Sequence, residues 1–510
     1  MVYYTDNIFN FLQRSFNMYF TSTRAAKNVT AAQAIAQGIS EDGGLFVPSG
    51  FPAIDAQTLN QLVNMSYKER AKKVLAYYLN DYSADEISHC VEAAYTGNFD
   101  NEEPAPLATL NDKMHILELW HGPTCAFKDM ALQILPHLLT AAAAKVAPDE
   151  EKVILVATSG DTGKAALEGF ADVPKTKIIV FYPVDGVSAM QKLQMTTQQG
   201  ANVAVCAIEG NFDDAQTGVK NIFSDADMQK FLADGKKAFS SANSINFGRL
   251  VPQIIYYVSA YCDLVKDGKI KMGDKINVVV PTGNFGNILA AVYARNMGIP
   301  IAKFICASNR NKILTDFIAT GKYDRNREFY QTTSPSMDIL ISSNLERMLY
   351  HLYDNNAQVI NSLMKDLKEK GVYQVSPEVL AKLQKEFFGG YCDDANCAAT
   401  IKKLFEEYHY LCDTHTAVAV NVYEQYIKET NDDTPCVIAS TASPYKFASA
   451  VLPALSGNAG DDEFAMLDKL SEVSGTPVPA PLANLHDKQV LHKTCVNKNQ
   501  MSDFIKNFLK

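Results

Sequence analysis

The chain has 510 residues, of which 47% are apolar and 20% charged, a balance typical of a globular protein with roughly two to four structural units. Its 57 acidic and 47 basic residues give a net charge of −10 without any long basic run, so we expect no nucleic-acid partner. No run of about 18 uncharged apolar residues occurs, so no membrane span is predicted. The 10 cysteines are scattered and form no Cys-x-x-Cys pair, which favours reduced thiols and a cytoplasmic location.

The first 110 residues mix helical patterns with turns and carry no recognisable chemistry. We expect residues 1–17 to be an N-terminal extension, ordered or disordered, and residues 18–110 to form a cover domain. Helices are predicted at 31–37, 66–80 and 85–94, with a turn and a short strand at 40–48.

The next stretch combines an apolar strand at 116–120, a Gly-Pro turn and a helix from about 127 to 144. Lys128 therefore lies where a strand gives way to a helix. Free N–H groups at the helix start and burial both disfavour its protonated form. A lysine held neutral is a nucleophile for carbonyl compounds and can form a Schiff base. A plain salt bridge with Asp129 is the competing interpretation.

From residue 152 onward, apolar β-branched runs alternate with helical patterns. This alternation predicts parallel sheets covered on both faces, with ligands at the carboxyl ends of the strands. Residues 337–430 are almost wholly helical by pattern, and we expect an insertion or a separate helical lobe there. The predicted strands are 152–158, 177–182, 202–208, 275–281, 302–307 and 436–440; the predicted helices are 187–198, 213–223, 250–265, 287–297, 345–353, 377–388 and 396–408.

One strand-to-helix turn has the features of a phosphate cradle. Its residues are Gly283, Asn284, Phe285, Gly286 and Asn287. The glycines let the backbone curl, and the following helix presents free N–H groups to an anion. The turn lacks the Gly-Lys-Ser/Thr of a nucleotide P-loop, so a small phosphate fits better. A simple tight turn is the alternative.

A second turn, containing Thr158, Ser159, Asp161 and Thr162, offers hydroxyls and helix N–H groups to a carboxylate or phosphate. An ordinary helix cap has the same residue types, so the pattern alone does not decide. A third turn, at 440–446, places hydroxyls after an apolar strand, where one of them can bond a heterocyclic nitrogen.

Two histidine patterns suggest other chemistry. His409, Cys412 and His415 are close enough in sequence to suggest a metal site, but their spacing follows a helix face only roughly and no second ligand group stands at a zinc-type interval. We therefore expect no metal. His121 is interpreted as a packed histidine, with a general base as the alternative.

Six motifs together resemble the threonine synthase family of pyridoxal-phosphate enzymes in its long microbial and fungal form. The resemblance covers the chain from Met18 onward, and the ordered set is specific although each motif alone is not. The motifs are Thr21-Ser-Thr-Arg24, Glu41-Asp-Gly-Gly-Leu-Phe-Val47, His121-Gly-Pro-Thr-Cys-Ala-Phe-Lys-Asp129, Thr158-Ser-Gly-Asp-Thr-Gly163, Gly283-Asn-Phe-Gly-Asn287 and Thr441-Ala-Ser-Pro-Tyr-Lys446.

The resemblance implies an α/β fold of the tryptophan-synthase-β-like type (fold type II), with two lobes built on parallel-type sheets. The expected parts are a large cofactor-binding domain (111–155, 265–336 and 434–490), a small substrate-binding α/β domain (156–264), a helical insertion (337–433) and a C-terminal segment (491–510).

The resemblance also implies roles for single residues. Lys128 matches the family's Schiff-base lysine, which acts as the catalytic base, and Thr441 matches the hydroxyl at the pyridine nitrogen of pyridoxal 5'-phosphate. The turn 283–287 matches the loop for the cofactor phosphate. The residues matching the substrate-binding positions are Thr158, Ser159, Asp161, Thr162, Arg249 as the phosphate clamp, and Lys446 as a second candidate for that clamp.

The implied activity is that of a carbon–oxygen lyase acting on phosphates. It converts O-phospho-L-homoserine and water to L-threonine and phosphate, the last step of threonine biosynthesis. Three alternatives stay open: a phospholyase of the same fold that releases 2-oxobutyrate, a serine/threonine dehydratase, and a non-catalytic protein that keeps the fold. The expected partner is the small-molecule substrate, and the chain is expected to be a monomer or a homodimer.

Overall fold

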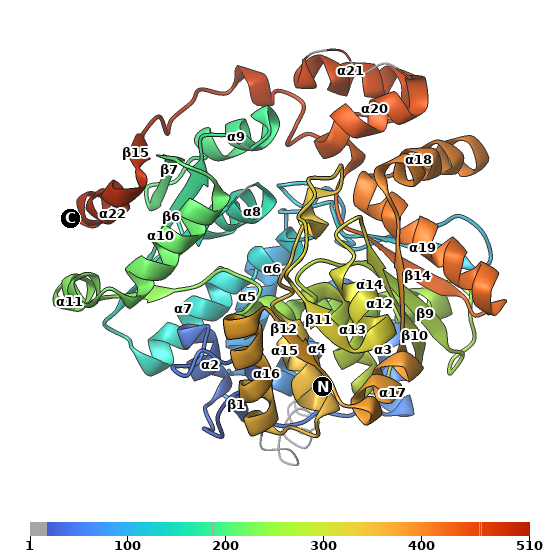
Figure 1. Cartoon of the computed structure of the whole chain (residues 1–510), viewed down its shortest axis with the longest axis horizontal. Helices are drawn as coiled ribbons and strands as arrows, with labels where there is room; N and C mark the ends of the chain where they lie inside the picture. Colours follow the sequence, from blue (N-terminus) through green and yellow to red (C-terminus); the bar gives the residue numbers. More distant parts are fainter. Residues whose placement is uncertain (1–17, 159, 186, 458–459, 461) are drawn as a thin grey trace, which may run out of the picture.

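The computed structural model describes residues 18–158, 160–185, 187–457, 460 and 462–510. The predicted extension 1–17 and the predicted site residue Ser159 therefore lie outside the described residues. Two sheets with mainly parallel strands form two lobes that lie side by side in Figure 1. The predicted α/β class with two parallel-type sheet lobes is confirmed. Within the described part of the chain, no helix has the length and apolar character needed to cross a lipid bilayer.

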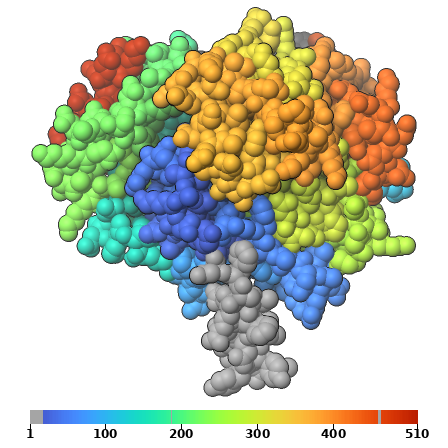
Figure 2. Space-filling view, turned by 60° about the horizontal axis from the view of Figure 1, so that its bottom comes forward, coloured from blue at the N-terminus to red at the C-terminus, as the bar shows by residue number. Residues whose placement is uncertain are grey.

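The cover region begins with a two-stranded antiparallel sheet and four helices. Three of the helices start with a capping box, in which a Thr or Ser side chain and a Gln or Glu side chain satisfy the first N–H groups. Arg24 forms an ion pair of 2.7 Å with Glu346, and Figure 2 shows this blue segment directly beside the orange one around residue 370. The elements are β1 (Phe20–Ser22), α2 (Ala31–Gln37), β2 (Phe46–Pro48), α3 (Ala56–Val63), α4 (Tyr67–Tyr78) and α5 (Ala84–Tyr95).

The large lobe contains a six-stranded sheet with the order β13-β10-β9-β14-β4-β3, parallel except at the β3–β4 edge. Alternate residues of its central strand β9 enter different cores: Val278 and Val280 pack with α12 and α13, while Val279 packs with α19. Both faces are therefore covered, as the continuous apolar run predicted. The elements are β3 (Leu107–Thr109), β4 (Met114–Glu118), α6 (Asp129–Leu132), α7 (Leu135–Val146), α12 (Phe247–Lys266), β9 (Ile276–Pro281), α13 (Gly286–Asn296), β10 (Ile301–Ser308), α14 (Ile313–Thr320), α19 (Thr414–Thr430) and β14 (Cys436–Ser440).

The small lobe contains a five-stranded parallel sheet with the order β15-β7-β6-β5-β8. Its edge strand β15 comes from the C-terminal segment, whose helix α22 packs on the same face as α10 and α11. In Figure 1 this red segment lies beside the green lobe. The elements are β5 (Glu151–Ala157), α8 (Asp161–Phe170), β6 (Thr176–Pro183), α9 (Ala189–Thr196), β7 (Val203–Glu209), α10 (Phe212–Ser224), α11 (Ala226–Asp234), β8 (Lys237–Ser240), β15 (Cys495–Asn497) and α22 (Met501–Leu509).

The region expected to be almost wholly helical also contains strands, so that expectation is corrected. The predicted helix 377–388 ends at Glu386, and Phe387–Tyr391 forms strand β13, which pairs in parallel with β10 at the edge of the large sheet. The short strand β12 pairs with β11. The elements are β11 (Lys322–Asp324), η1 (Pro335–Met337), α15 (Leu345–Leu352), α16 (Ala357–Lys370), β12 (Val372–Gln374), α17 (Pro377–Glu386), β13 (Phe387–Tyr391) and α18 (Asp394–Tyr408).

The helix predicted from about 127 to 144 is two helices, α6 and α7. Pro136 lacks the N–H group that would bond the carbonyl of Leu132, so the helical ladder is interrupted there. Gly169 of α8 packs against the same carbonyl so closely that an added Cβ would lie 2.0 Å from the oxygen. The break thus lets α8 approach the segment that carries Lys128.

The predicted domain limits stay predictions. They place most of helix α12 in the small lobe, but this helix packs against α13 and α4.

The remaining elements follow β14. The last elements are η2 (Pro444–Phe447), α20 (Ala448–Ser456), α21 (Glu463–Ser474), η3 (Leu485–Asp487) and η4 (Lys498–Gln500).

Candidate active site

Lys128 directly precedes α6, and its side chain is 11% exposed. Its Nζ atom lies 3.4 Å from Oδ2 of Asp161 and 3.4 Å from Oγ of Ser336. Burial lowers the pKa of the Lys128 amine from its ordinary value. The positive charges of Lys446 and Arg249 act in the same direction, whereas the carboxylate of Asp161 opposes them. The helix dipole expected to contribute belongs to a helix of only four residues, so burial is the main cause.

Asp161, the first residue of α8, joins the two lobes electrostatically. One carboxylate oxygen contacts Lys128, and the other lies 2.5 Å from Nζ of Lys446 and accepts a hydrogen bond of 3.1 Å from Gln191. Burial alone would raise the pKa of Asp161, but Lys446 and Lys128 together hold it well below its ordinary value. Lys446 also donates to the carbonyl of Thr124 at 2.9 Å, so its ammonium group is engaged by protein atoms on two sides.

The turn between β9 and α13 holds residues 283–287. Phe285 adopts a left-handed conformation with φ of 62°, uncommon for a bulky residue, and its ring packs against Phe387 of β13. Asn287 accepts a hydrogen bond from Tyr257 through Oδ1, while its buried Nδ2 has no hydrogen-bond partner. A Cβ added at Gly283 would lie 2.6 Å from the carbonyl oxygen of Ser336, so this close approach requires glycine. The first N–H groups of α13 also lack intrahelical acceptors.

Helix α12 presents Arg249, Gln253 and Tyr257 at spacings of four residues, which places them on one face. Gln253 donates to the carbonyl of Arg249, and Tyr257 donates to Asn287 at the start of α13. Arg249 is 3% exposed; it donates through Nη1 to the carbonyl of Ala242, and its buried Nε has no partner. Burial lowers the pKa of Arg249 to about 10, so the guanidinium stays charged at neutral pH.

Three predicted hydroxyl residues have different surroundings. Thr441 is buried next to the lysine segment, because its carbonyl accepts the N–H of Phe127 at 2.8 Å. Thr158 is buried, and its Oγ1 accepts the N–H groups of Gly160 and Gly163. Thr162 is half-buried on the first turn of α8.

Several site residues carried no signal in the sequence. Ser336 contacts Lys128 across 208 positions, and Asn344 donates to the carbonyl of Asn284 across 60. Only contacts made by the folded chain bring these residues to the site. Asp129 is not a solvated salt-bridge partner. It is fully buried and accepts two hydrogen bonds from Thr124.

The two histidines that stand out in the sequence are both bonded to carboxylates. His121 lies between two of them, with Nδ1 2.8 Å from Asp100 and Nε2 2.9 Å from Glu118, and these contacts raise its pKa against the effect of burial. His415 is paired with Asp413 at 2.6 Å. Across the described residues, no group of three or more His, Cys, Asp or Glu side chains is arranged to hold a metal ion.

These groups fit an aldehyde that carries a phosphate. Lys128 supplies a buried amine whose lowered pKa favours the neutral form. The neutral amine is the form that attacks a carbonyl. The start of α13 and the unpartnered Nδ2 of Asn287 supply hydrogen-bond donors for an anion. Arg249 adds a buried guanidinium whose Nε–H donor has no partner. A buried site with this excess of donors is completed by an anionic ligand.

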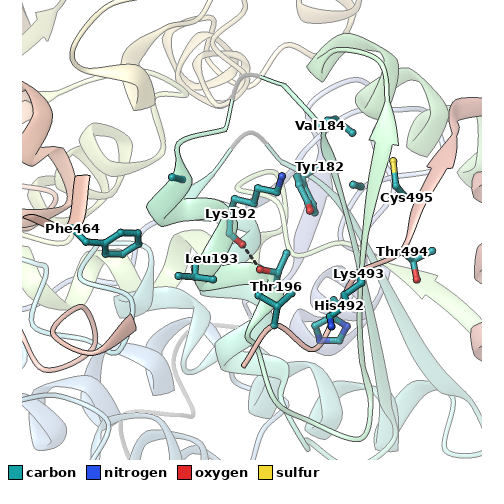
Figure 3. Close-up of a pocket in the computed structure, with 13 residues that line it drawn as sticks. Tyr182, Val184, Lys192, Leu193, Thr196, Phe464, His492, Lys493, Thr494 and Cys495 are labelled. Carbon is teal, nitrogen blue, oxygen red and sulfur yellow. Dashed lines mark hydrogen bonds between the residues drawn. The ribbon is translucent and has the colours of Figure 1, made fainter. Parts of the chain in front are cut away.

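A cavity of about 500 Å³ is lined by residues of β6, α9 and the segment 490–495, and none of the predicted site residues is among them. Figure 3 shows Lys192 of α9 extending toward Tyr182 of β6, Thr196 of α9 next to His492, and Phe464 of α21 at one end. Gln191, the neighbour of Lys192, bonds instead to Asp161. The cavity is therefore separate from the site around Lys128.

Comparison with known families defines the class of protein. The model "Pyridoxal-phosphate dependent enzyme" matches residues 101–441, which include the buried Lys128 amine and the turn 283–287. The chain is thus a pyridoxal-phosphate-dependent enzyme of fold type II. The models "Threonine synthase N terminus" and "Threonine synthase, C-terminal" match residues 19–95 and 416–505. The chain belongs to the threonine synthase family.

Individual relatives agree. Threonine synthase from Saccharomyces cerevisiae is 37% identical over 86% of this chain and 89% of its own length. The structure of threonine synthase with bound pyridoxal phosphate from Brucella melitensis superimposes with a TM-score of 0.86 at 34% identity, covering 97% of this chain and all of that one. Human threonine synthase-like 1 is 44% identical over 83% of this chain, and the chain spans 58% of the length of that relative.

Proposed function

We propose that this chain is a threonine synthase, which converts O-phospho-L-homoserine and water to L-threonine and phosphate. The observation that carries the proposal is the buried Lys128 amine, which pairs with Asp161 and contacts Ser336. The carbonyl of Ser336 packs against Gly283 in the turn that also carries the unpartnered Nδ2 of Asn287. The substrate has two anionic ends, a carboxylate and a phosphate. Beside the cofactor's own phosphate it therefore needs two further anion-binding groups, and the N-terminus of α8 and Arg249 are the candidates.

We assign the cofactor-holding residues as follows. Lys128 would bond the cofactor aldehyde, the turn 283–287 and the start of α13 would hold its phosphate, and the hydroxyl of Thr441 would bond its ring nitrogen. Pyridoxal phosphate, when bound, supplies an electron sink for negative charge at the substrate carbons. The family's dependence on this cofactor and the spare donors of the site support the assignment.

The protein's own groups then move protons and hold the substrate. Lys128 Nζ, once its amine is free, takes the proton from Cα and carries protons at Cβ, because its lowered pKa keeps the basic form available. Thr158, Ser159, Asp161 and Thr162 belong to the turn that positions the substrate carboxylate. Arg249 clamps the phosphate that leaves Cγ. Lys446 stays the second candidate for that clamp, and its bonds to Asp161 and Thr124 support a further role in holding Asp161 in place.

The test is product analysis with purified full-length protein, cofactor and O-phosphohomoserine. We expect threonine and phosphate in equal amounts. Release of 2-oxobutyrate with phosphate would instead identify a phospholyase. Release of 2-oxobutyrate from threonine, or of pyruvate from serine, would identify a dehydratase, and binding without turnover a non-catalytic relative.

Two variants connect this activity to the site. Lys128→Ala should abolish turnover, whereas Lys145→Ala, which removes a surface lysine paired with Glu86, should not. Arg249→Ala should raise the KM for the phosphorylated substrate about tenfold or more, since it removes a charged hydrogen-bond donor. Full turnover in Lys128→Ala would overturn the proposal.

We also propose that the protein works in the cytoplasm, as a monomer or homodimer. The 10 cysteines, all within the described residues, are free thiols, which supports a reducing compartment. Cell fractionation and light scattering at several protein concentrations test the two statements.

A further inference from the structure

A buried carboxylate–imidazole pair stands behind the site at the start of α19. The side chains of Asp413 and His415 are 0% and 2% exposed, and Nδ1 of His415 lies 2.6 Å from Oδ2 of Asp413. The carboxylate also accepts the N–H groups of His415 and Thr416 and the hydroxyl of Thr416. Asp413 thus caps the helix and fixes the imidazole at the same time.

The far side of the ring determines its tautomer. The backbone N–H of Ser336 points at Nε2 of His415, with an N–N distance of 3.1 Å. A backbone N–H can only donate, so Nε2 must carry a lone pair and the ring proton must sit on Nδ1, facing Asp413. The ring of Phe447 packs edge-on against the imidazole at 4.8 Å. The imidazole is therefore held in one tautomer and one orientation.

Ser336 connects this pair to the active site. Its hydroxyl lies 3.4 Å from Nζ of Lys128. Its carbonyl oxygen lies so close to Gly283 that a Cβ added there would be 2.6 Å away. The flanking residues are anchored as well, since Asn309 donates to Oγ of Ser334 at 3.0 Å and to Oδ1 of Asp338 at 2.8 Å. Ser336 thus contacts the Lys128 amine, the turn 283–287 and the His415 imidazole.

We propose that Ser336 orients the Lys128 amine and that Asp413 and His415 are positioning residues that hold Ser336 in place. A neutral amine has two N–H bonds and one lone pair. Asp161 Oδ2 and Ser336 Oγ accept the two N–H bonds, so the lone pair, which is the electron pair that attacks a carbonyl carbon, points away from both acceptors. This role rests on the proposed function, because it requires Lys128 to be the group that bonds the cofactor.

The experiment follows attachment of pyridoxal phosphate to Lys128 in full-length protein stripped of cofactor. Borohydride is added at increasing times, and the reduced adduct on the Lys128 peptide is measured by mass spectrometry. Ser336→Ala, His415→Asn and Asp413→Asn should each slow attachment about tenfold, the effect of losing one hydrogen bond to a reactive group. His415→Gln should attach faster than His415→Asn, because a Gln side chain can again present an acceptor to the Ser336 N–H group.

His351→Asn is the control for loss of a partly buried histidine that is hydrogen-bonded through both ring nitrogens. His351 bonds only to Tyr293 and Asn355 by the hydrogen bonds of its two ring nitrogens, away from Lys128. The His351→Asn substitution should lower the unfolding temperature without slowing attachment of pyridoxal phosphate to Lys128. The proposal is overturned if Ser336→Ala attaches within twofold of the unmodified chain, or if His415→Asn is no slower than His351→Asn at equal folded fraction. Absence of any Lys128 adduct in the unmodified chain would instead overturn the proposed function.

Discussion

The turn between β9 and α13 leaves polar groups unpaired, whereas the described part of the turn between β5 and α8 pairs its own. In the first turn, Nδ2 of Asn287 is buried without a partner and Phe285 is held in a left-handed conformation. In the second, the hydroxyl of Thr158 accepts two backbone N–H groups and donates to the carbonyl of Gly160. The carboxylate of Asp161 is held by two lysines.

The difference separates a ligand cradle from a platform. Spare donors and backbone strain at a buried position are retained where a ligand completes the structure. A turn whose hydroxyl is consumed internally is rigid instead, and its contribution is to place the next residue, here Asp161, beside Lys128. We therefore expect changes in the first turn to act on cofactor binding. Changes of Thr158 or Asp161 in the second turn should act on stability and on the charge state of Lys128, and through that rigid turn on the proposed substrate carboxylate site at the start of α8.

Asp161→Asn should have the largest effect. It leaves the buried Lys446 ammonium and the buried Lys128 amine without their shared carboxylate, and breaking a buried ion pair in this way costs about 3–5 kcal/mol. The free energy of unfolding, measured with urea at pH 7, should fall by that amount. Glu168→Gln on the same helix is the control: its pair with Lys164 is partly exposed, so a loss of about 0–1 kcal/mol is expected. Equal losses in the two variants would contradict the platform model.

The same variant has a signed pH dependence. The folded-state pKa of Asp161 lies below its ordinary value of 3.8, so its contribution to stability is present above pH 3.8 and is lost as the pH falls toward the folded-state pKa. The difference in unfolding free energy between the unmodified chain and Asp161→Asn should therefore narrow below about pH 3.8. A difference that stays constant from pH 7 to pH 3 would show that the pair contributes by packing alone.

Gly283→Ala tests the cradle from its backbone. The new methyl group would lie 2.6 Å from the carbonyl of Ser336, so either the turn or Ser336 must move. Displacement of a positioned group by about 1 Å can cost roughly 100-fold, so we expect about that loss in cofactor affinity. Gly235→Ala is the control, since its Cβ would meet nothing closer than 3.5 Å. Fluorescence titration of the stripped protein with pyridoxal phosphate measures both.

Asn287→Ala should weaken cofactor binding about tenfold, because it removes one hydrogen-bond donor to a charged phosphate. Tyr257→Phe is the informative partner: it removes only the hydroxyl that bonds Oδ1 of Asn287, and it should cost less than Asn287→Ala in the same titration. If Tyr257→Phe cost as much as Asn287→Ala, the amide would act through packing of α12 on α13 instead of through the phosphate.

Much of the fold could be predicted because its strands are long apolar runs. The predicted strand 436–440 matches β14, and the predicted 177–182 lies inside β6. Strand β13 escapes prediction because Phe-Phe-Gly-Gly-Tyr has neither β-branched residues nor a clear alternation, and it directly follows a helix. The break at Pro136 escapes prediction because the apolar spacing continues through it.

The site could be predicted only where local motifs carry it. The lysine segment and the turn 283–287 each carry a motif, and both approach Ser336, through Lys128 and Gly283, while their roles toward the cofactor stay predictions. Ser336 and Asn344 could not be found. Ser336 lies in the short 3-10 helix η1 and Asn344 directly precedes α15, neither segment carries a motif, and both reach the site through contacts across many residues. His415 stands out in the sequence for the wrong chemistry: its spacing from Cys412 suggests a metal, but its real partner, Asp413, is two positions away.

Thr158→Val should have the smallest effect and divides the two turns most clearly. Valine keeps the shape of threonine but removes the acceptor for the N–H groups of Gly160 and Gly163. Loss of a buried hydrogen bond costs about 1 kcal/mol of stability, and Thr158→Ser, which keeps the hydroxyl, should recover most of it. Cofactor affinity should change less than about twofold in either variant, because the hydroxyl is bonded within its own turn. A tenfold loss of cofactor affinity in Thr158→Val, with unchanged unfolding free energy, would mean that this turn is a second cradle after all.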